Sequence, residues 1–295
     1  MKTHEHVQAR SGPYFEGWYL KLQTKAGKAL ALIPALHVDS AGRRGASLQV
    51  VSSNASWWLE YPAADFSASR EPFRIHLGPN RFAAQGISLR VQRPGCSLYG
   101  ALRFGPFLPL QSDIMGPFRF LSGMECRHGV ISMAHPLEGA LTLNGETLEF
   151  SGGTGYIETD RGASFPSGYL WTQCAWHEGR PASLMLSVAT IPLSKLRFTG
   201  CICAVLYRGQ EYRLATYRGV RVEEWSRHGA VIRQGKYRLE AEAPGEGGQA
   251  LRAPVAGAMR RTIHENLATE MRYRFWIGEK LLFEHTDRCA SFEYV

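Results

Sequence analysis

Acidic side chains recur at every second position in one short stretch of the sequence, where they alternate with apolar and small residues. Tyr156, Glu158 and Asp160 share one face if this stretch is an extended strand. A carboxyl group beside an aromatic ring loses solvation, which raises its pKa and suits it to act as a general acid. Two interpretations of the stretch stay open: Glu158 or Asp160 donates a proton to a ligand, or these acids together with Arg161 only hold the loop that follows.

A second run of alternating residues follows after a loop and adds aromatic and amide groups. Trp171 and Gln173 share a face of this run, and Phe165 lies in the loop before it. If the two runs are adjacent strands, these side chains and Tyr156 surround one patch and contact a ligand there. Arg161, which follows the acids, either orients the proton donor or only holds the loop.

Glu16 and Trp18 form a similar pair near the N-terminus, in the motif FEGWY. On a strand they share a face, which places the carboxyl group beside the indole. Two interpretations stay open: Glu16 is a general acid with a raised pKa, or it stands at the entrance of a barrel and bonds to the backbone.

Two further acids and one histidine are candidates with a plainer alternative. Glu125 either pairs with Arg127 and fixes a strand, or it belongs to the site together with His128. Asp113, in an apolar loop, either caps that loop or closes a pocket. His128 and His135 are seven residues apart and face opposite sides of a regular strand, so no shared metal site is expected.

The composition narrows the class of protein. The chain has 295 residues, a net charge of +8 and a pI near 9.3, but Lys and Arg are scattered, which favours a solvated basic surface over a nucleic-acid site. It has no nucleotide-binding glycine motif and no apolar run of about 18 residues. Since no export signal begins the chain, we expect a cytoplasmic protein, for which peripheral contact with an acidic membrane surface stays open.

Short apolar runs separated by Gly, Pro or Asn dominate the chain and predict an all-β protein. Strands at this spacing are typical of sandwiches and barrels, and Asn144-Gly145 is a hairpin signal. Residues 105–124 predict a crossover loop or lid, and residues 263–269 predict a short helix. We expect two antiparallel barrel-like or sandwich domains packed together, over 1–148 and 149–295.

Four motifs, spread in order over most of the chain, together resemble the bacterial branch of the tocopherol cyclase family. They are FEGWYLK from residue 15, SGMECRHGVISMAHPLEG from residue 122, GYIETDRGASFPSGYLWTQC from residue 155 and ATYRG from residue 215. That family is related in fold to lipocalin-like (calycin-type) carotenoid hydratases and Diels–Alderases. The resemblance therefore implies the same two-domain β architecture.

The resemblance also implies a chemistry, in which a phenol oxygen adds to a prenyl double bond and closes a ring. This reaction needs an acid to protonate the alkene, an aromatic wall for the tertiary cation and an apolar tunnel, but no cofactor or metal. The candidate acids are Glu16, Glu125, Glu158 and Asp160. The candidate wall residues are Trp18, Tyr156, Phe165 and Trp171.

The plant enzymes have Lys-Asn-Trp where this chain has Thr159, Asp160 and Arg161. We therefore expect an apolar isoprenoid-type substrate, without restricting it to tocopherol precursors. Two alternatives stay open: a lipocalin-like protein that binds an apolar small molecule without chemistry, and a hydratase that adds water instead of a phenol.

Overall fold

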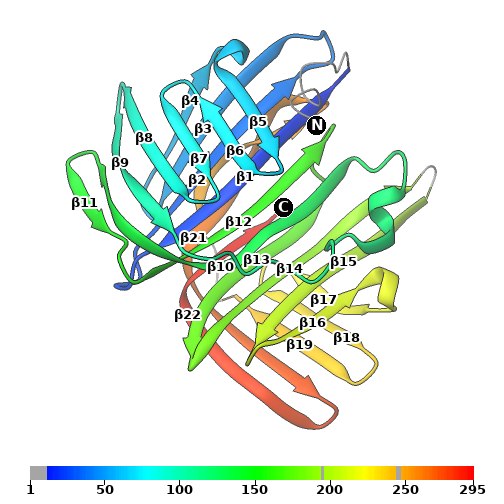
Figure 1. Cartoon of the computed structure of the whole chain (residues 1–295). Helices are drawn as coiled ribbons and strands as arrows, with labels where there is room; N and C mark the ends of the chain where they lie inside the picture. The colour runs from blue at the N-terminus through cyan, green and yellow to red at the C-terminus, as the bar shows by residue number, and fades with distance from the viewer. Residues whose placement is uncertain (1–11, 194–195, 244–246) are drawn as a thin grey trace.

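The computed structural model describes residues 12–193, 196–243 and 247–295, and these are almost entirely β-strand (Figure 1). Twelve strands form one antiparallel sheet and ten form a second, which confirms the expected all-β class. Among the described residues, no helix is long and apolar enough to cross a lipid bilayer. Residues 1–11, on which the cytoplasmic expectation rests, lie outside the described part of the chain.

The first sheet, sheet A, consists of two meanders that meet at its centre. Its strand order is β4-β3-β2-β1-β12-β10-β9-β8-β7-β6-β5, and β11 pairs with β10. The strands are β1 (Tyr14–Gln23), β2 (Ala29–Val38), β3 (Arg44–Ser52), β4 (Ser56–Tyr61), β5 (Phe66–Arg70), β6 (Phe73–Leu77), β7 (Asn80–Ala83), β8 (Gly86–Arg93), β9 (Cys96–Phe104), β10 (Cys126–Leu143), β11 (Glu146–Glu149) and β12 (Gly153–Gly162).

The second sheet, sheet B, has the order β16-β15-β14-β13-β22-β21-β19-β18-β17, with β20 paired to β21. Its strands are β13 (Tyr169–Glu178), β14 (Arg180–Leu193), β15 (Leu196–Tyr207), β16 (Gln210–Ala215), β17 (Arg221–Ser226), β18 (Gly229–Gln234), β19 (Tyr237–Glu242), β20 (Gln249–Val255), β21 (Ala258–Ile277) and β22 (Lys280–Tyr294). Three short 3₁₀ helices complete the described structure: η1 (Ala63–Asp65), η2 (Gly116–Phe120) and η3 (Thr216–Arg218).

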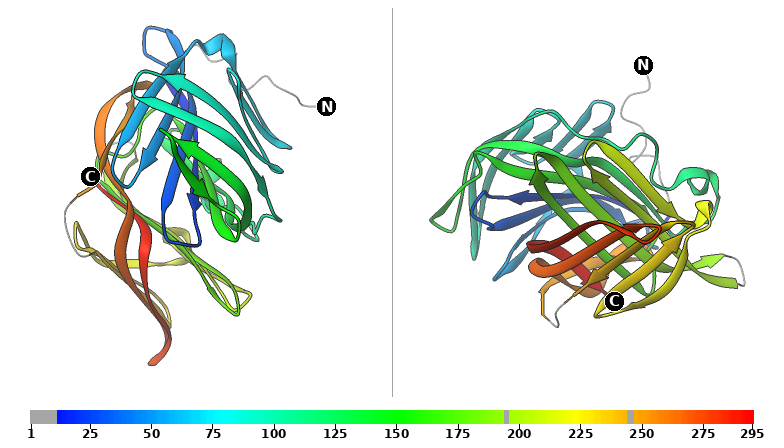
Figure 2. Two further views of the ribbon diagram at one scale, coloured as in Figure 1. Left: turned by 90° about the vertical axis from the view of Figure 1, so that its left-hand side faces the viewer. Right: turned by 90° about the horizontal axis from the view of Figure 1, so that it is seen from below.

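In both sheets the last strand lies beside the first. β12 pairs with β1 on one side and β10 on the other, and β22 lies in the same way between β13 and β21. In Figure 2 the blue and cyan strands of sheet A and the yellow and red strands of sheet B lie on opposite sides of the molecule, and the orange segment of sheet B extends along the blue strands. The central triplets β1-β12-β10 and β13-β22-β21 therefore bring residues distant in sequence to the contact between the sheets.

Tight turns with left-handed residues fix the hairpins. Asn144 and Gly145 have φ values of 49° and 87° and connect β10 to β11. Two successive positive φ values define the type I′ turn, whose twist matches that of the flanking strands. The hairpin signal at Asn144-Gly145 is thus confirmed.

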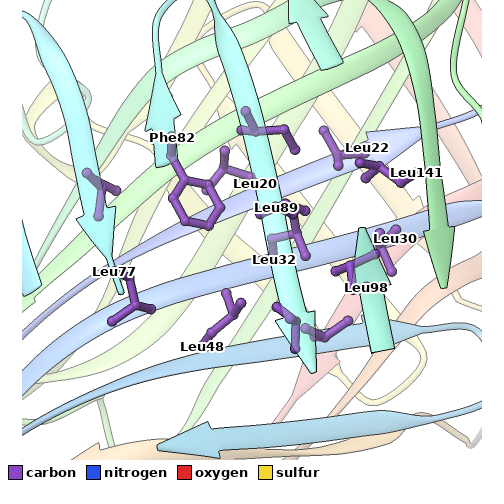
Figure 3. Close-up of a cluster of buried hydrophobic side chains, with 14 of the residues drawn as sticks. Leu20, Leu22, Leu30, Leu32, Leu48, Leu77, Phe82, Leu89, Leu98 and Leu141 are labelled. Atoms are coloured by element: carbon purple, nitrogen blue, oxygen red, sulfur yellow. The ribbon is translucent and has the colours of Figure 1, made fainter. Parts of the chain in front are cut away.

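Both faces of the central strands are buried, because each sheet curls around its own core and also packs against the other sheet. Figure 3 shows the core of sheet A, where Leu20 and Leu22 of β1 contact leucines of β2 and β8. Sheet B has its own core around Tyr273 and Phe275. A third apolar cluster, which includes Tyr19, fills the contact between the sheets. Successive side chains of β1 therefore point alternately into the core of sheet A and into the contact between the sheets.

The connection from β9 to β10 leaves sheet A, contacts residues of sheet B and returns to sheet A. Arg213 of sheet B donates from Nη1 to the Asp113 carbonyl oxygen at 3.1 Å, and Tyr217 donates to the Ile114 carbonyl oxygen at 3.0 Å. The segment is a long loop, as expected over 105–124, and contains the short helix η2. It joins two strands that pair in sheet A, so it is not a crossover connection.

Two details differ from the sequence-based expectations. The chain passes from sheet A to sheet B between Gly162 and Tyr169, so β12 belongs with the first sheet and not with the half that the 148/149 boundary gave it. The helix expected over 263–269 is wrong, because this segment lies within β21. Its residues alternate in burial with a period of two, which is strand behaviour.

Gly257, in the turn between β20 and β21, brings this hairpin against sheet A. Its N–H donates to the Ala163 carbonyl oxygen at 2.7 Å, and its φ is +75°. A Cβ atom here would lie 1.8 Å from the Val38 carbonyl oxygen and 2.6 Å from the Tyr14 nitrogen. No side chain fits without moving one sheet relative to the other.

We expect Gly257→Ala to lower the free energy of unfolding by more than about 2 kcal/mol, because a left-handed alanine costs about 1 kcal/mol and the backbone clash adds to it. Urea denaturation measures this loss. Gly278→Ala is the matched control, since Gly278 has φ of +63° and open space around the added Cβ. Equal losses in the two variants would show that the contact at Gly257 does not matter.

Candidate functional site

A pocket of about 170 Å³ lies between the two sheets and is lined mainly by apolar side chains. Sheet A and its connections supply one wall, and sheet B supplies the other. The polar groups on the wall are Gln49, Cys126, His128, Glu158, Asp160, Ser187, Cys201, Arg252 and Glu293. Three carboxyl groups and a histidine thus face an otherwise apolar space.

The strand register of sheet A places the first group of polar residues side by side. Tyr19 on β1 lies opposite Glu158 on β12, and Asp160 lies opposite His128 on β10. Residues in register on neighbouring antiparallel strands point to the same face, with Cβ atoms about 5 Å apart. Sheet A therefore presents Tyr19, Glu158, Asp160 and His128 as one continuous patch.

Sheet B presents a matching row. Trp171 on β13 lies opposite Glu293 on β22, and Glu293 lies opposite Glu265 on β21. Hydrogen bonds join this row to sheet A, since Trp171 Nε1 donates to Glu158 Oε2 at 3.2 Å and the Tyr19 hydroxyl donates to Glu265. The site is thus made by both sheets at their contact.

Glu158 is the most enclosed acid of the pocket wall in sheet A, at 5% exposure. Its Oε2 accepts hydrogen bonds from the Tyr156 hydroxyl at 2.5 Å and from Trp171 Nε1. Burial raises the pKa of Glu158, and the nearby charge of His128 only partly opposes this effect. The saturated Oε2 leaves Oε1 as the oxygen that can exchange a proton with a ligand.

His128 lies between two carboxyl groups. Its Nδ1 is 3.0 Å from Asp160 Oδ1, and its Nε2 is 3.3 Å from Glu158 Oε2, an ion-pair contact. Burial alone lowers the pKa of His128, but the negative charges of Asp160 and Glu158 outweigh it and hold the pKa well above its usual value. The imidazole is therefore held as a cation between the two acids.

Sheet B contributes two acids, each held by a tyrosine. Tyr169 donates to Glu293 Oε2 at 2.6 Å, and Tyr19 donates to Glu265 Oε1. Burial raises the pKa of Glu265 to about 7 and raises that of Glu293 well above its usual range, where the charge of Glu265 adds to the effect. Lys21, also buried, donates to the Cys289 carbonyl oxygen at 2.6 Å.

This arrangement can move protons to and from an apolar ligand. It combines neutral carboxyl groups, which can donate, with a carboxylate–imidazolium cluster, which can accept.

His128, Glu158 and Asp160 also bring ligand atoms within 4.8 Å of one another, so among the described residues they are the group that could hold a metal ion. Because both imidazole nitrogens already face carboxylates, a metal would have to displace one of these contacts. The expectation of a metal-free site stays a prediction.

Five of the twelve candidate residues from the sequence line the pocket. They are His128, Glu158, Asp160, Phe165 and Trp171. Tyr156 lies directly behind them and bonds to Glu158. Gln173 is buried at 1% exposure on the same face of β13 as Trp171, and neither atom of its amide has a hydrogen-bond partner among the described residues.

Glu16 and Trp18 lie on the opposite face of β1, away from the pocket. Arg70 donates to Glu16 Oε1 from Nε at 2.9 Å and from Nη2 at 2.5 Å, and Tyr14 donates to Oε2 at 2.8 Å. Trp18 packs into the core of sheet A beside Phe66. Glu16 and Trp18 share a face of β1, as the sequence predicts, but this face points into the core of sheet A and not into the pocket.

The remaining three candidates also lie outside the pocket lining. Arg161 is on the Glu16 side of β12, in register with it. Glu125 is exposed just before β10, where its carbonyl oxygen accepts from Ala163 N. Asp113 Oδ1 accepts from the Met115 backbone N–H at 2.8 Å, which is the loop cap proposed as its plainer role.

The expectation that the two polar runs form adjacent strands is wrong. β12 belongs to sheet A and β13 to sheet B, and the patch forms because the sheets face each other. Sequence reasoning also missed Tyr19, Glu265 and Glu293. The signal that could have identified them is a charged or hydroxyl group within an otherwise apolar strand. Glu293, for example, alternates with Ser291 and follows a run of buried residues.

We expect NMR to show His128 still protonated well above its unfolded-state pKa of about 6.5, because two carboxylates flank it. Its charge stabilises the fold fully below about pH 6.5, and this contribution is lost as the pH rises through the higher folded-state pKa. Asp160→Asn should lower the pKa of His128 by removing one of these charges.

Glu138→Gln, an exposed acid on the same strand, is the matched control and should leave the His128 titration unchanged. A wild-type His128 that titrates near 6.5, or one that is indifferent to Asp160→Asn, would contradict the charge assignment.

Comparison with solved structures shows the fold. The chain superposes on kievitone hydratase from Nectria haematococca with a TM-score of 0.55 and 11% identity, over 96% of this chain and 89% of that one. For a putative AttH from Nitrosomonas europaea the TM-score is 0.54 at 12% identity, covering 99% and 94%. For CghA it is 0.58 at 11% identity, covering 96% and 88%.

Sequence comparison shows the family. A probable chloroplastic tocopherol cyclase of Oryza sativa subsp. japonica is 27% identical over 183 residues, covering 56% of this chain and 39% of the rice protein. The chain thus matches well under half of that protein's length. The profile of the tocopherol cyclase-like family matches residues 104–294. This range includes all three acids that line the pocket, Glu158, Asp160 and Glu293. The chain belongs to the tocopherol cyclase-like family.

Proposed function

We propose that this protein is a cofactor-independent cyclase, which closes a ring on a prenylated phenol or a similar apolar isoprenoid-type substrate. The observation that carries this proposal is a largely apolar pocket with a buried acid of raised pKa, Glu293, in its wall. An acid that stays neutral at neutral pH can protonate an alkene, which a solvated carboxylate cannot do.

The reaction has three steps that the pocket residues can serve. A carboxyl O–H bond breaks as a C–H bond forms at the alkene, which leaves a tertiary cation. The phenol oxygen then forms a C–O bond to this cation. Glu158 accepts the phenolic proton at Oε1, because its Oε2 is occupied by Tyr156 and Trp171. The substrate and product are isomers, so no other reactant is required.

Aromatic rings border the space in which the cation would form. Tyr19 packs edge-on against Trp171 with ring centroids 5.2 Å apart, and Phe165 packs in the same way on Tyr169 at 6.0 Å. Aromatic faces attract cations, and they also exclude the water that would quench one. These rings support ring closure over hydration.

The relatives support a small apolar substrate. The rice relative is named a probable tocopherol cyclase, and kievitone hydratase shares the fold. CghA has been solved with the small molecule Sch210972, in a structure that superposes here with a TM-score of 0.56. Cyclisation and hydration begin with the same alkene protonation and differ only in the oxygen nucleophile.

We expect the protein to convert geranyl hydroquinone in deuterated water to a ring-closed isomer with one deuterium on carbon. Glu158→Gln should lower turnover by about 100-fold, because the amide keeps the hydrogen bonds but cannot accept a proton. Mass spectrometry of the product measures both results. Glu125→Gln, at an exposed acid outside the pocket, is the control and should keep full turnover.

Three other results of this experiment would each contradict part of the cyclase proposal. A product heavier by one water, labelled from isotopic water, would replace the cyclase with a hydratase. Tight binding of geranyl hydroquinone with no product would replace it with the lipocalin-like binder. Full turnover in Glu158→Gln would remove Glu158 from the mechanism.

A further inference from the structure

Two glutamates of sheet B lie directly opposite each other on neighbouring strands. Glu265 on β21 is in register with Glu293 on β22, so both side chains point to the contact between the sheets. Their exposures are 0% and 9%. Two like charges directly opposite each other on neighbouring strands repel even on a solvated sheet. Burial makes this repulsion far more costly, because little water remains to screen the charges.

The groups that face this pair do not neutralise two negative charges. Tyr19 and Lys21 approach from β1, Glu158 and Asp160 from β12, Tyr169 from β13 and Ser291 from β22. Of these, the Lys21 ammonium is the only cation, and its hydrogen bond goes to the Cys289 carbonyl oxygen. Glu158 and Asp160 share the single positive charge of His128, and both still act on Glu293 as negative neighbours, so the surroundings favour a proton on the pair.

The hydrogen bonds of Glu265 and Glu293 also favour a proton on the pair. Glu265 Oε1 and Glu293 Oε2 each accept from one tyrosine hydroxyl. Glu265 Oε2 is buried and has no hydrogen-bond partner among the described residues. A buried carboxylate oxygen without a donor is costly, and one proton bound by the pair would reduce that cost because it removes a negative charge.

We propose that Glu265 and Glu293 share one proton and that this carboxyl pair is the acid that protonates the substrate alkene. Glu293 lines the pocket and delivers the proton, whereas Glu265 lies behind it. The assignment rests on the proposed cyclase function and adds a residue pair that the candidate list lacked.

The step balances within the site. The Glu293 O–H bond breaks, its proton and the alkene π electrons form the new C–H bond, and the cation appears beside a pair that has become more negative. That negative charge stabilises the cation. The phenolic proton passes to Glu158, and exchange with solvent returns one proton to the Glu265–Glu293 pair. The separate positions of donor and acceptor agree with their places on opposite sheets.

The pH dependence of turnover tests the role of each glutamate. Glu293→Gln should reduce turnover of geranyl hydroquinone by about 100-fold or more while binding persists. Glu265→Gln removes the neighbouring negative charge, which lowers the pKa of Glu293. The basic limb of the kcat/KM profile should therefore move to lower pH. A merely structural role of Glu265 would change the amplitude of the profile and not its position.

Infrared spectroscopy tests the shared proton without any substrate, so it stays informative if geranyl hydroquinone is not turned over. The wild-type protein at neutral pH should show a protonated carboxyl C=O band that is weakened in Glu293→Gln and in Glu265→Gln. Glu16→Gln is the matched control, because Glu16 is equally buried but paired with Arg70. It should leave the band unchanged.

Absence of the band in the wild-type protein would overturn the proposal, whether or not the variants fold. So would wild-type turnover in Glu293→Gln, or a basic limb that does not move in Glu265→Gln. A band that behaves as expected together with no cyclised product would keep the carboxyl pair and reject the cyclase. The two proposals can therefore fail separately.

Discussion

The packing of the two sheets through their central strands is the constraint on which the rest of this structure depends. Because both faces of these strands are buried, each polar group on the contact face needs a partner on its own sheet or on the facing one. Tyr19 of sheet A bonds to Glu265 of sheet B, and Trp171 of sheet B bonds to Glu158 of sheet A. The contact is thus specified by hydrogen bonds as well as by apolar burial.

This packing also sets the electrostatics. Burial raises the pKa of Glu158, Glu265 and Glu293. The charge of Glu158 adds to this effect at Glu265 and Glu293, and the charge of Glu265 adds to it at Glu293, because little water remains to screen these charges. Such a cluster is costly for folding, and an apolar contact would be more stable. Perturbed acids that line a pocket are therefore better explained by chemistry than by stability. The same burial that destabilises the charges keeps a proton available to an apolar ligand.

The sequence predicted the all-β class and the Asn144-Gly145 turn, and two of its four candidate acids, Glu158 and Asp160, line the pocket. Its failures have physical causes. Period-two patterns identify which residues share a face, as they did for Glu16 with Trp18 and for Glu158 with Asp160. They do not show which face meets the other sheet when both faces of a strand are buried, and β1 was therefore assigned the wrong functional face. The Glu265 region was taken for a helix, so its inward-facing acid was overlooked. Contact between β12 and β13 across the sheets is a long-range property that local patterns do not contain.

The two sheets carry different groups of acids, and the proposed proton transfer needs both groups to face the same pocket. Sheet A holds Glu158, His128 and Asp160 as a charged cluster that can accept a proton, and sheet B holds Glu265 and Glu293, which can donate one. If all these acids lay on one sheet, mutual repulsion would leave no separate donor and acceptor on opposite sides of a ligand. Solved structures at 11–12% identity keep the same two-sheet scaffold. The scaffold therefore tolerates extensive sequence change, and the few buried polar residues at the contact between the sheets are what gives this pocket its chemical character.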